Sequence, residues 1–365
     1  METHHIVQTI EALVRLESPT TDKAAVDRCG ALLERMLAGA GGSVERITQR
    51  ERGDHLLARF AGPGGAPIMI LGHFDTVWPV GTLAHMPVKR EGDRLYGPGT
   101  FDMKGGIAIA LAAIDAVHAG RGPQAPIVVV LTTDEEIGSA TSRAFIEEEA
   151  RTCRAVLVLE PALPGGALKT ARKGCGEFEL IVDGIAAHAG LDPGKGASAI
   201  HELAAQIRVI EQLQDLANGV SVNVGVVSGG TRPNVIAERA SAVIDARAPT
   251  REAAKQIESA IRNLQPVRAG TRLTINGGFD RPAMERTPAS RELFARARAV
   301  ASSLGRPLDE GSAGGGSDGN FTAAVGVPTL DGLGAVGDGA HAAHEHVDIP
   351  SLAWRAALVA GLLVE

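Results

Sequence analysis

The chain is short of aromatic side chains, of paired cysteines and of long apolar runs. Aromatic residues make up only 3% of its 365 residues, too few for the stacking platforms that bind single-stranded nucleic acids. The net charge of −7 also argues against a nucleic-acid-binding protein, because phosphate contacts need a basic surface. No apolar run reaches the length needed to cross a membrane, so a membrane-spanning protein is not expected.

The three cysteines are Cys29, Cys153 and Cys175, which are odd in number, widely spaced and without CxxC spacing. They therefore predict neither a disulfide framework nor a cysteine-based zinc site. Residues 1–16 mix His, Glu and Arg with apolar residues and lack the uninterrupted apolar core of a signal peptide. We expect a cytoplasmic protein. Its length favours two domains, and its 44% apolar content is enough for a large core.

Three short apolar runs predict buried strands of a parallel sheet. Residues 66–73, 127–133 and 155–160 are rich in Val, Ile and Leu, and each run ends at a polar residue. Such continuous runs are typical of central strands that are buried on both faces. Helical stretches are expected between them, at 104–119 and 141–151. This alternation of strand and helix predicts an α/β domain with a mostly parallel sheet.

The pattern changes after about residue 174. Residues 176–184 alternate apolar and polar side chains, as a half-buried strand does. The elements expected after this strand are a helix, two strands, a helix and a strand, at 197–214, 220–228, 237–247, 250–263 and 271–277. The order βαββαβ fits a ferredoxin-like split βαβ unit with an antiparallel sheet. We therefore predict an α/β domain of residues 1–174 and 286–365, into which a smaller α+β domain of residues 175–285 is inserted.

Ionisable residues follow the predicted buried strands. His73 and Asp75 come after the first strand, Glu135 and Glu136 after the second, and Glu160 ends the third. In open parallel sheets, functional sites gather outside the carboxyl ends of the strands. The sequence therefore predicts that these side chains meet at one edge of the sheet.

Asp102 adds a further carboxylate, at the start of the helix expected at 104–119. So many carboxylates together would repel one another and raise each other's pKa, unless cations lie between them. His and carboxylate side chains are ligands that suit zinc or a similar first-row ion. A single carboxylate after a strand is more often a helix cap or a solvated loop residue, but four such segments favour a pair of metal ions.

Several motifs of the chain resemble, in order and spacing, those of the di-zinc exopeptidase and deacylase family. This family includes aminoacylase, acetylornithine deacetylase, succinyl-diaminopimelate desuccinylase and the bacterial glutamate carboxypeptidases. The resemblance covers nearly the whole chain. The matching motifs are GHFDTV at 72–77, YGPG at 96–99, DMKGG at 102–106, TDEEIGS at 133–139, EP at 160–161 and HAG at 188–190. The segments DTV at 75–77, GTL at 81–83 and GGGSD at 314–318 make the glutamate carboxypeptidases that cleave folate-like substrates the most similar group.

The resemblance implies a site with two zinc ions per subunit, for which cobalt or manganese are alternatives with the same ligands. His73 and Glu160 would bind one ion, and Glu136 and His341 the other. Asp102 would bridge the two ions.

The last metal ligand lies in a stretch that holds three histidines. The family places its ligand four residues before a glutamate, which selects His341 because Glu345 follows it at that spacing. His344 and His346 are then expected to be loop or surface residues, and His344 is the alternative ligand.

The resemblance also implies the catalytic residues. Glu135 would be the general base that takes a proton from the attacking water and passes it to the leaving amine. Asp75 would hydrogen-bond the far nitrogen of His73 and so fix its tautomer. His188 would stabilise the oxyanion, often in the site of the partner subunit.

Substrate-binding residues are expected from the same comparison. Asn234 and Arg247 match positions that contact the substrate carboxylate, and Gly315, Gly316 and Ser317 would line the pocket. A structural salt bridge is the alternative interpretation for Arg247, and a helix-capping turn is the alternative for Ser317.

Together these features predict a metallopeptidase or amidohydrolase of the carboxypeptidase type. It would cleave the amide bond of small N-acyl or peptidyl amino acids, with C-terminal glutamate favoured, and the inserted domain would act as lid and homodimer contact. An aminoacylase, a deacetylase or a dipeptidase of the same family is the nearest alternative. A non-catalytic binding protein with a relic metal site is another, but the intact Glu135 argues against it.

Overall fold

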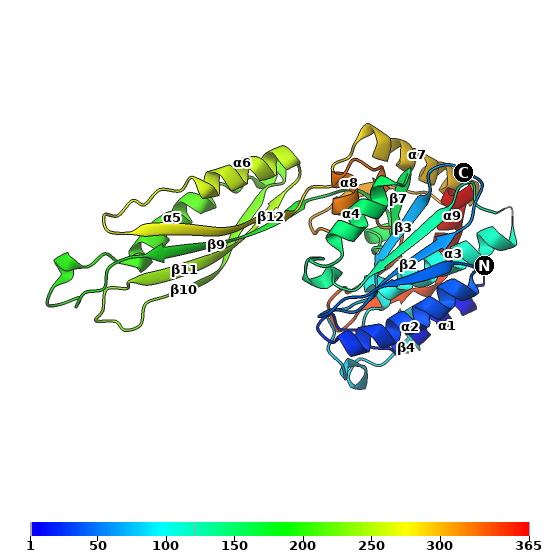
Figure 1. Cartoon of the computed structure of the whole chain (residues 1–365), viewed down its shortest axis with the longest axis horizontal. Coiled ribbons are helices and arrows are strands. Elements are labelled where there is room, and N and C mark those ends of the chain that lie inside the picture. Colours follow the sequence, from blue (N-terminus) through cyan, green and yellow to red (C-terminus); the bar gives the residue numbers. More distant parts are fainter. Residues whose placement is uncertain (1, 121, 365) are drawn as a thin grey trace. The chain divides into compact units, whose positions relative to one another are not determined.

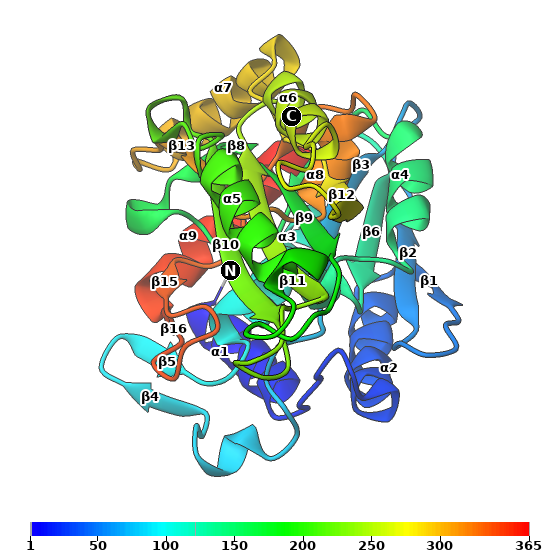
Figure 2. The same ribbon diagram turned by 90° about the vertical axis from the view of Figure 1, so that its left-hand side faces the viewer.

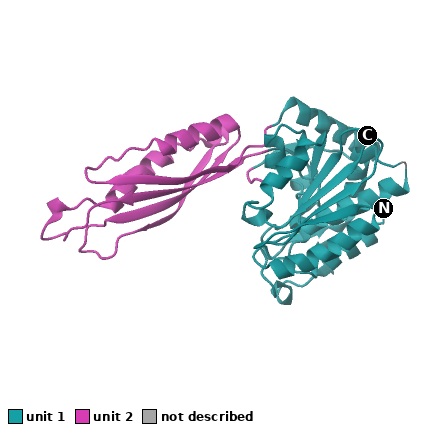
Figure 3. Ribbon diagram, in the orientation of Figure 1, with its two compact units in different colours: residues 1–171, 286–313, 317–365 teal, residues 172–285, 314–316 magenta. Residues whose placement is uncertain are grey.

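The computed structural model of the chain describes residues 2–120 and 122–364. It divides into two compact units, shown in Figure 3. Unit 1 comprises residues 1–171, 286–313 and 317–365, and unit 2 comprises residues 172–285 and 314–316. The break after residue 171 lies close to the boundary expected at 174.

A six-stranded sheet forms the centre of unit 1. Its order is β1 (Ser43–Ile47), β2 (His55–Phe60), β6 (Ile127–Thr132), β3 (Ile68–His73), β7 (Ala155–Val158) and β14 (Thr329–Leu330). From β6 to β14 all neighbours pair in parallel, so the mostly parallel sheet expected from the apolar runs is present. The sequence analysis did not predict β1 and β2, which add an antiparallel edge beside β6 (Figure 2).

Helices cover both faces of this sheet (Figure 1). On one face the core is shared with α1 (Thr3–Val14), α2 (Lys23–Gly39), α3 (Gly105–Ala119), α7 (Pro288–Ser303) and α9 (Ile349–Val364). The other face packs against α4 (Arg143–Arg151) and α8 (Gly319–Ala324). Alternate residues of β3 enter the two cores, Ile70 on one face and Met69 on the other. This double burial explains why the strand has apolar side chains on both of its faces.

Glycine allows the start of α3 to approach the end of β7. A Cβ atom on Gly106 would lie 2.2 Å from the carbonyl oxygen of Leu159, which is too close for any side chain. Because Glu160 follows Leu159 directly, this contact brings the α3 terminus beside one of the predicted metal ligands. Close packing therefore explains why the second glycine of the DMKGG motif has no side chain.

Unit 2 contains a four-stranded antiparallel sheet with two helices. The elements are β9 (Gly174–Asp183), α5 (Ala199–Glu211), β10 (Ser221–Gly229), β11 (Arg239–Ala248), α6 (Arg251–Arg262) and β12 (Arg272–Arg281). The spatial order is β10-β11-β9-β12, and both helices share one core with the sheet. The βαββαβ order agrees with the expectation from sequence.

One short segment was assigned to the wrong unit. Residues 314–316 were expected in the larger domain, but they pack with unit 2. The reason is Arg172, whose guanidinium donates hydrogen bonds to the carbonyl oxygens of Gly315 and Gly316 at 3.1 and 3.2 Å. At the boundary, β8 (Leu168–Arg172) pairs with β13 (Glu310–Ala313).

Short elements complete unit 1. A small sheet has the order β15 (Gly337–Asp338), β16 (His346–Asp348), β5 (Arg94–Tyr96) and β4 (Lys89–Glu91). Single turns of helix are η1 (Thr82–Ala84), η2 (Thr100–Lys104), η3 (Glu135–Ile137) and η4 (Pro164–Gly166), and unit 2 has η5 (Pro193–Lys195) and η6 (Leu216–Asn218).

Within residues 2–120 and 122–364, no helix combines the length and apolar character needed to span a bilayer.

Candidate metal centre

Three adjacent parallel strands deliver ionisable side chains to one edge of the sheet in unit 1. His73 is the last residue of β3, and Glu160 lies two residues beyond the end of β7. Glu135 and Glu136 form the turn η3 directly after β6. Because the order of these strands is β6-β3-β7, their carboxyl ends are neighbours.

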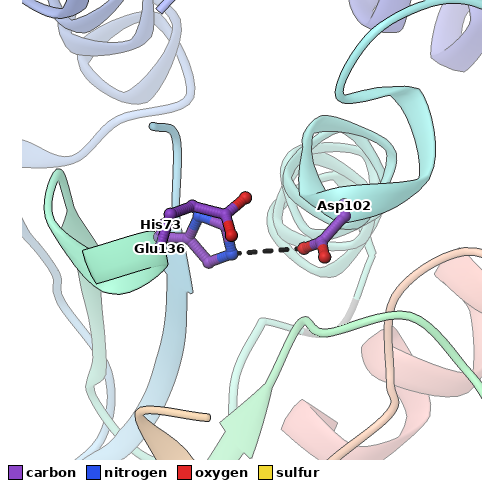
Figure 4. A group of neighbouring side chains, drawn as sticks. All are labelled: His73, Asp102 and Glu136. Atoms are coloured by element: carbon purple, nitrogen blue, oxygen red, sulfur yellow. Dashed lines mark ion pairs between the residues drawn. The ribbon is translucent and has the colours of Figure 1, made fainter. Parts of the chain in front are cut away.

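Two loops bring the remaining predicted ligands to the same edge. Asp102 lies in η2, immediately before α3. His341 lies in the loop between β15 and β16 and adopts a left-handed backbone conformation, with φ of 61°. Figure 4 shows His73, Asp102 and Glu136 directed toward one another from three different segments.

The two carboxylate oxygens of Asp102 face two separate groups. Oδ1 of Asp102 lies 3.3 Å from Nε2 of His73, and that nitrogen lies 3.5 Å from Oε1 of Glu160. Oδ2 of Asp102 lies 3.4 Å from Nε2 of His341, which lies 3.0 Å from Oε2 of Glu136. The arrangement is that of a carboxylate between two metal positions, each with one further histidine and one further glutamate.

The spacing of these atoms fits tetrahedral metal coordination. Metal–ligand bonds of about 2.0–2.1 Å place neighbouring ligands of a tetrahedral zinc ion about 3.3–3.4 Å apart. Among the residues that the structure describes, Oδ1 of Asp102 and Oε1 of Glu136 are buried and have no hydrogen-bond partner. Buried carboxylate oxygens of this kind need a cation or a donor, so the residues present fit a pair of divalent ions.

The carboxylates of this cluster raise the pKa values of its two histidines. Burial opposes the charged form of His73, but its contacts with Asp102, Asp75 and Glu160 outweigh burial and raise its pKa. Asp102 and Glu136 raise the pKa of His341 to about 10.

The two carboxylates behave differently. Burial raises the pKa of Asp102, but the two histidines outweigh it and hold the pKa of this carboxyl well below its usual range. Burial dominates at Glu136, whose pKa is raised. Protons on the histidines thus take the place that cations would have in balancing the carboxylates.

Asp75 supports His73 from the side opposite to the metal position. Its Oδ1 lies 3.3 Å from Nδ1 of His73, and its backbone oxygen lies 3.1 Å from the same nitrogen. Its Oδ2 accepts hydrogen bonds from Oγ1 of Thr20 at 2.7 Å and from the backbone amide of Glu136 at 3.3 Å. With Nδ1 as the donor, Nε2 of His73 keeps a lone pair for a metal ion.

Glu135 lies beside the first metal position. One of its carboxylate oxygens falls within 4.8 Å of the ligand atoms of His73 and Glu160. The loop that carries it is fixed by Asp134, whose Oδ2 accepts hydrogen bonds from the amide and the hydroxyl of Thr141 at 2.7 and 2.8 Å. Glu135 is therefore placed to exchange a proton with a group held at that position.

The structure places His341, and not His344, beside the carboxylate cluster. The side chain of His344 is 65% exposed, and its Nε2 lies 3.9 Å from Oδ2 of Asp338. His346 is buried and stacks in a tilted arrangement on Tyr96. His346 was expected in a loop or at the surface, but it begins β16 and faces the interior.

The predicted oxyanion residue His188 lies in unit 2 with its tautomer fixed. It is exposed, and its Nδ1 accepts hydrogen bonds from the backbone amides of Gly190 and Leu191, both at 3.1 Å. A nitrogen that accepts two hydrogen bonds carries no proton, so the proton of the neutral ring is on Nε2. Asn234 is its neighbour, since its carbonyl oxygen accepts from the amide of Ala189 at 3.0 Å.

Arg247 lies at the other end of the unit 2 sheet. Its guanidinium donates to both carboxylate oxygens of Asp245, at 2.9 and 2.6 Å, and contacts Sγ of Cys175 at 2.6 Å. A Cβ atom on Gly316 would lie 3.0 Å from that sulfur and 3.0 Å from Cδ of Arg281. Arg247 thus forms the salt bridge that was its alternative interpretation. Arg172, Arg281 and, through Cys175, Arg247 lie near residues 314–316.

Ser317 belongs to unit 1 and is fully buried. Its hydroxyl donates to Oδ2 of Asp331 at 2.7 Å and accepts from the amide of Gly319 at 3.1 Å, at the start of α8. These bonds hold the turn that leads into α8, but the N-cap of this helix is Asp318 and has no side-chain capping bond, so the helix-capping interpretation is not confirmed. The contact of Ser317 with substrate stays a prediction.

Sequence reasoning gave no role to two residues that contact the site. Glu345 served only to mark the position of His341, yet its buried carboxylate accepts a hydrogen bond from the amide of Asp102 at 3.0 Å. Trp78 donates to the same carboxylate at 2.8 Å. The four-residue spacing between His341 and Glu345 is the sequence feature that could have indicated a role for Glu345. Burial raises the pKa of Glu345 to about 7, against the hydrogen bonds that lower it.

Comparison with known proteins agrees with this geometry. Residues 69–365 match the model of peptidase family M20/M25/M40. Carboxypeptidase G2 of Pseudomonas sp. (strain RS-16) is 31% identical over 99% of this chain and 89% of that protein. Succinyl-diaminopimelate desuccinylase of Rhodopseudomonas palustris (strain BisB5) is 30% identical over 97% of this chain and 96% of that protein.

Solved structures share the fold over the whole chain. The aminopeptidase PepT of Bacillus cereus has a TM-score of 0.82 at 23% identity, covering 100% of this chain and 98% of that one. The M20 family metallo-carboxypeptidase Sso-CP2 of Sulfolobus solfataricus has a TM-score of 0.78 at 16% identity, covering 100% and 99%. The family model and the carboxypeptidase together establish that the chain belongs to peptidase family M20/M25/M40.

Proposed function

We propose that this metallopeptidase-family hydrolase uses two metal ions to cleave the amide bond of N-acyl or peptidyl amino acids, with C-terminal glutamate favoured. The observation that carries the proposal is Asp102, whose two oxygens each face a separate histidine and glutamate. A carboxypeptidase that is 31% identical over nearly the whole chain supports the reaction class.

The residues that would hold the two ions, taken to be zinc, are His73, Glu160, Glu136 and His341, with Asp102 shared between them. When bound, such ions polarise the scissile carbonyl and lower the pKa of water toward neutrality. Asp75 keeps the proton of His73 on Nδ1, so that Nε2 stays available as a ligand. Glu135 accepts the proton of the attacking water and returns it to the leaving amine.

The leaving amino acid carries a carboxylate, which needs a cationic pocket. Arg247 retains guanidinium N–H groups beyond the three contacts with Asp245 and Cys175. Gly316 lies near Cys175, which Arg247 contacts, and Gly315 and Gly316 expose backbone to a ligand because they have no side chain. This group therefore suits the carboxylate of a C-terminal amino acid. The desuccinylase relative favours an N-succinyl substrate as the alternative.

The predicted substrate residues of unit 2 form two groups at opposite ends of its sheet. Arg247 pairs with Cys175 at the start of β9, whereas His188 follows the end of β9. Ten extended residues span about 30 Å, more than the length of an N-acyl amino acid. We therefore propose a homodimer through unit 2, in which two copies of this unit contribute to one site.

A substrate screen tests the proposed function. N-acyl-glutamate, N-acetyl-ornithine, N-succinyl-diaminopimelate and dipeptides are compared by kcat/KM, with metal analysis of the same sample. We expect the highest value for acylated or peptidyl glutamate, and two metal ions per chain. A preference for the ornithine or diaminopimelate substrate would replace the glutamate assignment, and a metal-free protein that cleaves none of them would support the binding-protein alternative.

Replacing His188 by alanine is expected to lower kcat by about 10²–10³-fold, the usual effect of removing one oxyanion donor. Metal content and KM should change little, because the donor acts on charge that develops only in the transition state. His201→Ala is the matched control, since it removes another exposed histidine of unit 2. Equal kcat values for the two variants would contradict the role of His188.

A further inference from the structure

Glu345 is a fully buried carboxylate that accepts four N–H hydrogen bonds in unit 1. Oε2 accepts from Nε1 of Trp78 at 2.8 Å and from the amide of Gly99 at 2.9 Å. Oε1 accepts from the amides of Phe101 and Asp102, at 2.9 and 3.0 Å. Both oxygens are therefore occupied by donors.

These donors come from the segments that carry the proposed metal site. Trp78 lies three residues after Asp75, the partner of His73, and the three amides belong to the turn that presents Asp102. Glu345 itself lies four residues after His341. Its backbone adds a fifth link, because its carbonyl oxygen accepts from the amide of Gly97 at 3.2 Å. One side chain thus joins three segments that are far apart in the sequence.

The bond to the amide of Asp102 acts directly at the shared ligand. The amides at the beginning of a helix have no partner within the helix, so a turn such as η2 needs an outside acceptor to hold its shape. A small rotation of this turn would move both carboxylate oxygens of Asp102, and each of them faces a different metal position. Fixing the backbone at residue 102 therefore fixes the geometry of both positions at once.

A carboxylate is the side chain that this position requires. It offers two oxygens and no hydrogen, so it can accept from donors on both sides. A glutamine would turn its NH₂ group toward two of the four N–H donors. The surroundings are already rich in carboxylates, so a further negative charge lowers stability unless its hydrogen bonds offset the cost.

We propose that Glu345 is a positioning residue that holds Asp102 in the geometry needed to share two metal ions; this rests on the metal site of the proposed function. It touches neither substrate nor metal. Its effect should appear as metal affinity, because residues that orient metal ligands typically contribute 10–100-fold to binding.

The experiment compares Glu345→Gln and Glu345→Asp with Glu202→Gln. Glu202 is the matched control because it is also fully buried and accepts two backbone amides, those of Val267 and Arg268, but it lies in unit 2. Zinc is titrated into each metal-free protein against a competing chelator, and thermal unfolding of the same samples reports stability. We expect zinc binding about 10–100-fold weaker in both Glu345 variants and unchanged in Glu202→Gln, although all three lose stability.

The outcomes separate this inference from the function on which it rests. If the wild-type protein binds no zinc, the proposed function fails. If the wild-type protein binds zinc and both Glu345 variants bind it equally well, Glu345 is a structural residue only and the inference is overturned. If Glu345→Gln does not fold, Glu345→Asp decides alone, since it keeps the charge and shortens the side chain by one methylene. Weaker zinc binding by a folded Glu345→Asp supports the inference, and unchanged binding overturns it.

Discussion

Replacing Glu135 by glutamine is expected to lower kcat by about 10²–10⁴-fold, the usual contribution of a general base. Glutamine keeps the size of the side chain but cannot accept a proton. The proposed ligands are untouched, so two metal ions per chain should remain bound. Metal analysis and steady-state kinetics on the same sample measure both quantities.

The adjacent residue provides the control for this prediction. Oε2 of Glu136 lies 3.0 Å from Nε2 of His341, whereas Glu135 groups with His73 and Glu160. We expect Glu136→Gln to lose metal as well as activity. If Glu135→Gln also loses metal, the two glutamates have been assigned the wrong roles. If it keeps full activity, the proposed mechanism is wrong.

Periodicity predicted β3, β6 and β7, but it missed β2, which also contributes residues to both cores. The runs that became β3, β6 and β7 are apolar throughout because each strand alternates between two cores. The sequence analysis did not predict β1 either, which has no fully buried residue. Strands at the edge of a sheet have weaker patterns, so their number and direction do not follow from the sequence alone.

The meeting of carboxylates at one edge of the sheet was predictable from the residues, whereas the role of each ligand, His341 included, came from the resemblance and stays a prediction. Carboxylates placed after parallel strands must meet at one edge, and only cations make such a cluster stable. The positions of Gly314–Gly316 and of Glu345 did not follow from any pattern of the same kind. The first depends on a hydrogen bond from Arg172, and the second on four donors that folding alone brings together.

Removing the metal ions with a chelator is expected to abolish hydrolysis, and adding zinc back should restore it in a manner that depends on pH. Asp102 and Glu136 raise the pKa of His341 to about 10, and Asp102, Asp75 and Glu160 raise that of His73 against the effect of burial. At neutral pH the imidazole of His341 in the metal-free protein therefore carries an extra proton. A metal ion needs the neutral ring, so binding to His341 should release about one proton per chain and tighten as pH rises.

The stability of the metal-free protein should fall as pH rises, whereas zinc affinity should increase. Because the pKa of His341 is higher in the folded state than the 6.5 of an ordinary imidazole, the stability it contributes is fully present below pH 6.5 and is lost as pH rises through about 10. In the metal-loaded protein cations replace these protons, and this loss should not occur. Unfolding temperatures of both forms between these pH values, with calorimetric titrations in two buffers of different protonation enthalpy, measure the effect. Zinc binding without proton release at pH 7 would contradict the paired-histidine site, as would hydrolysis by the metal-free protein.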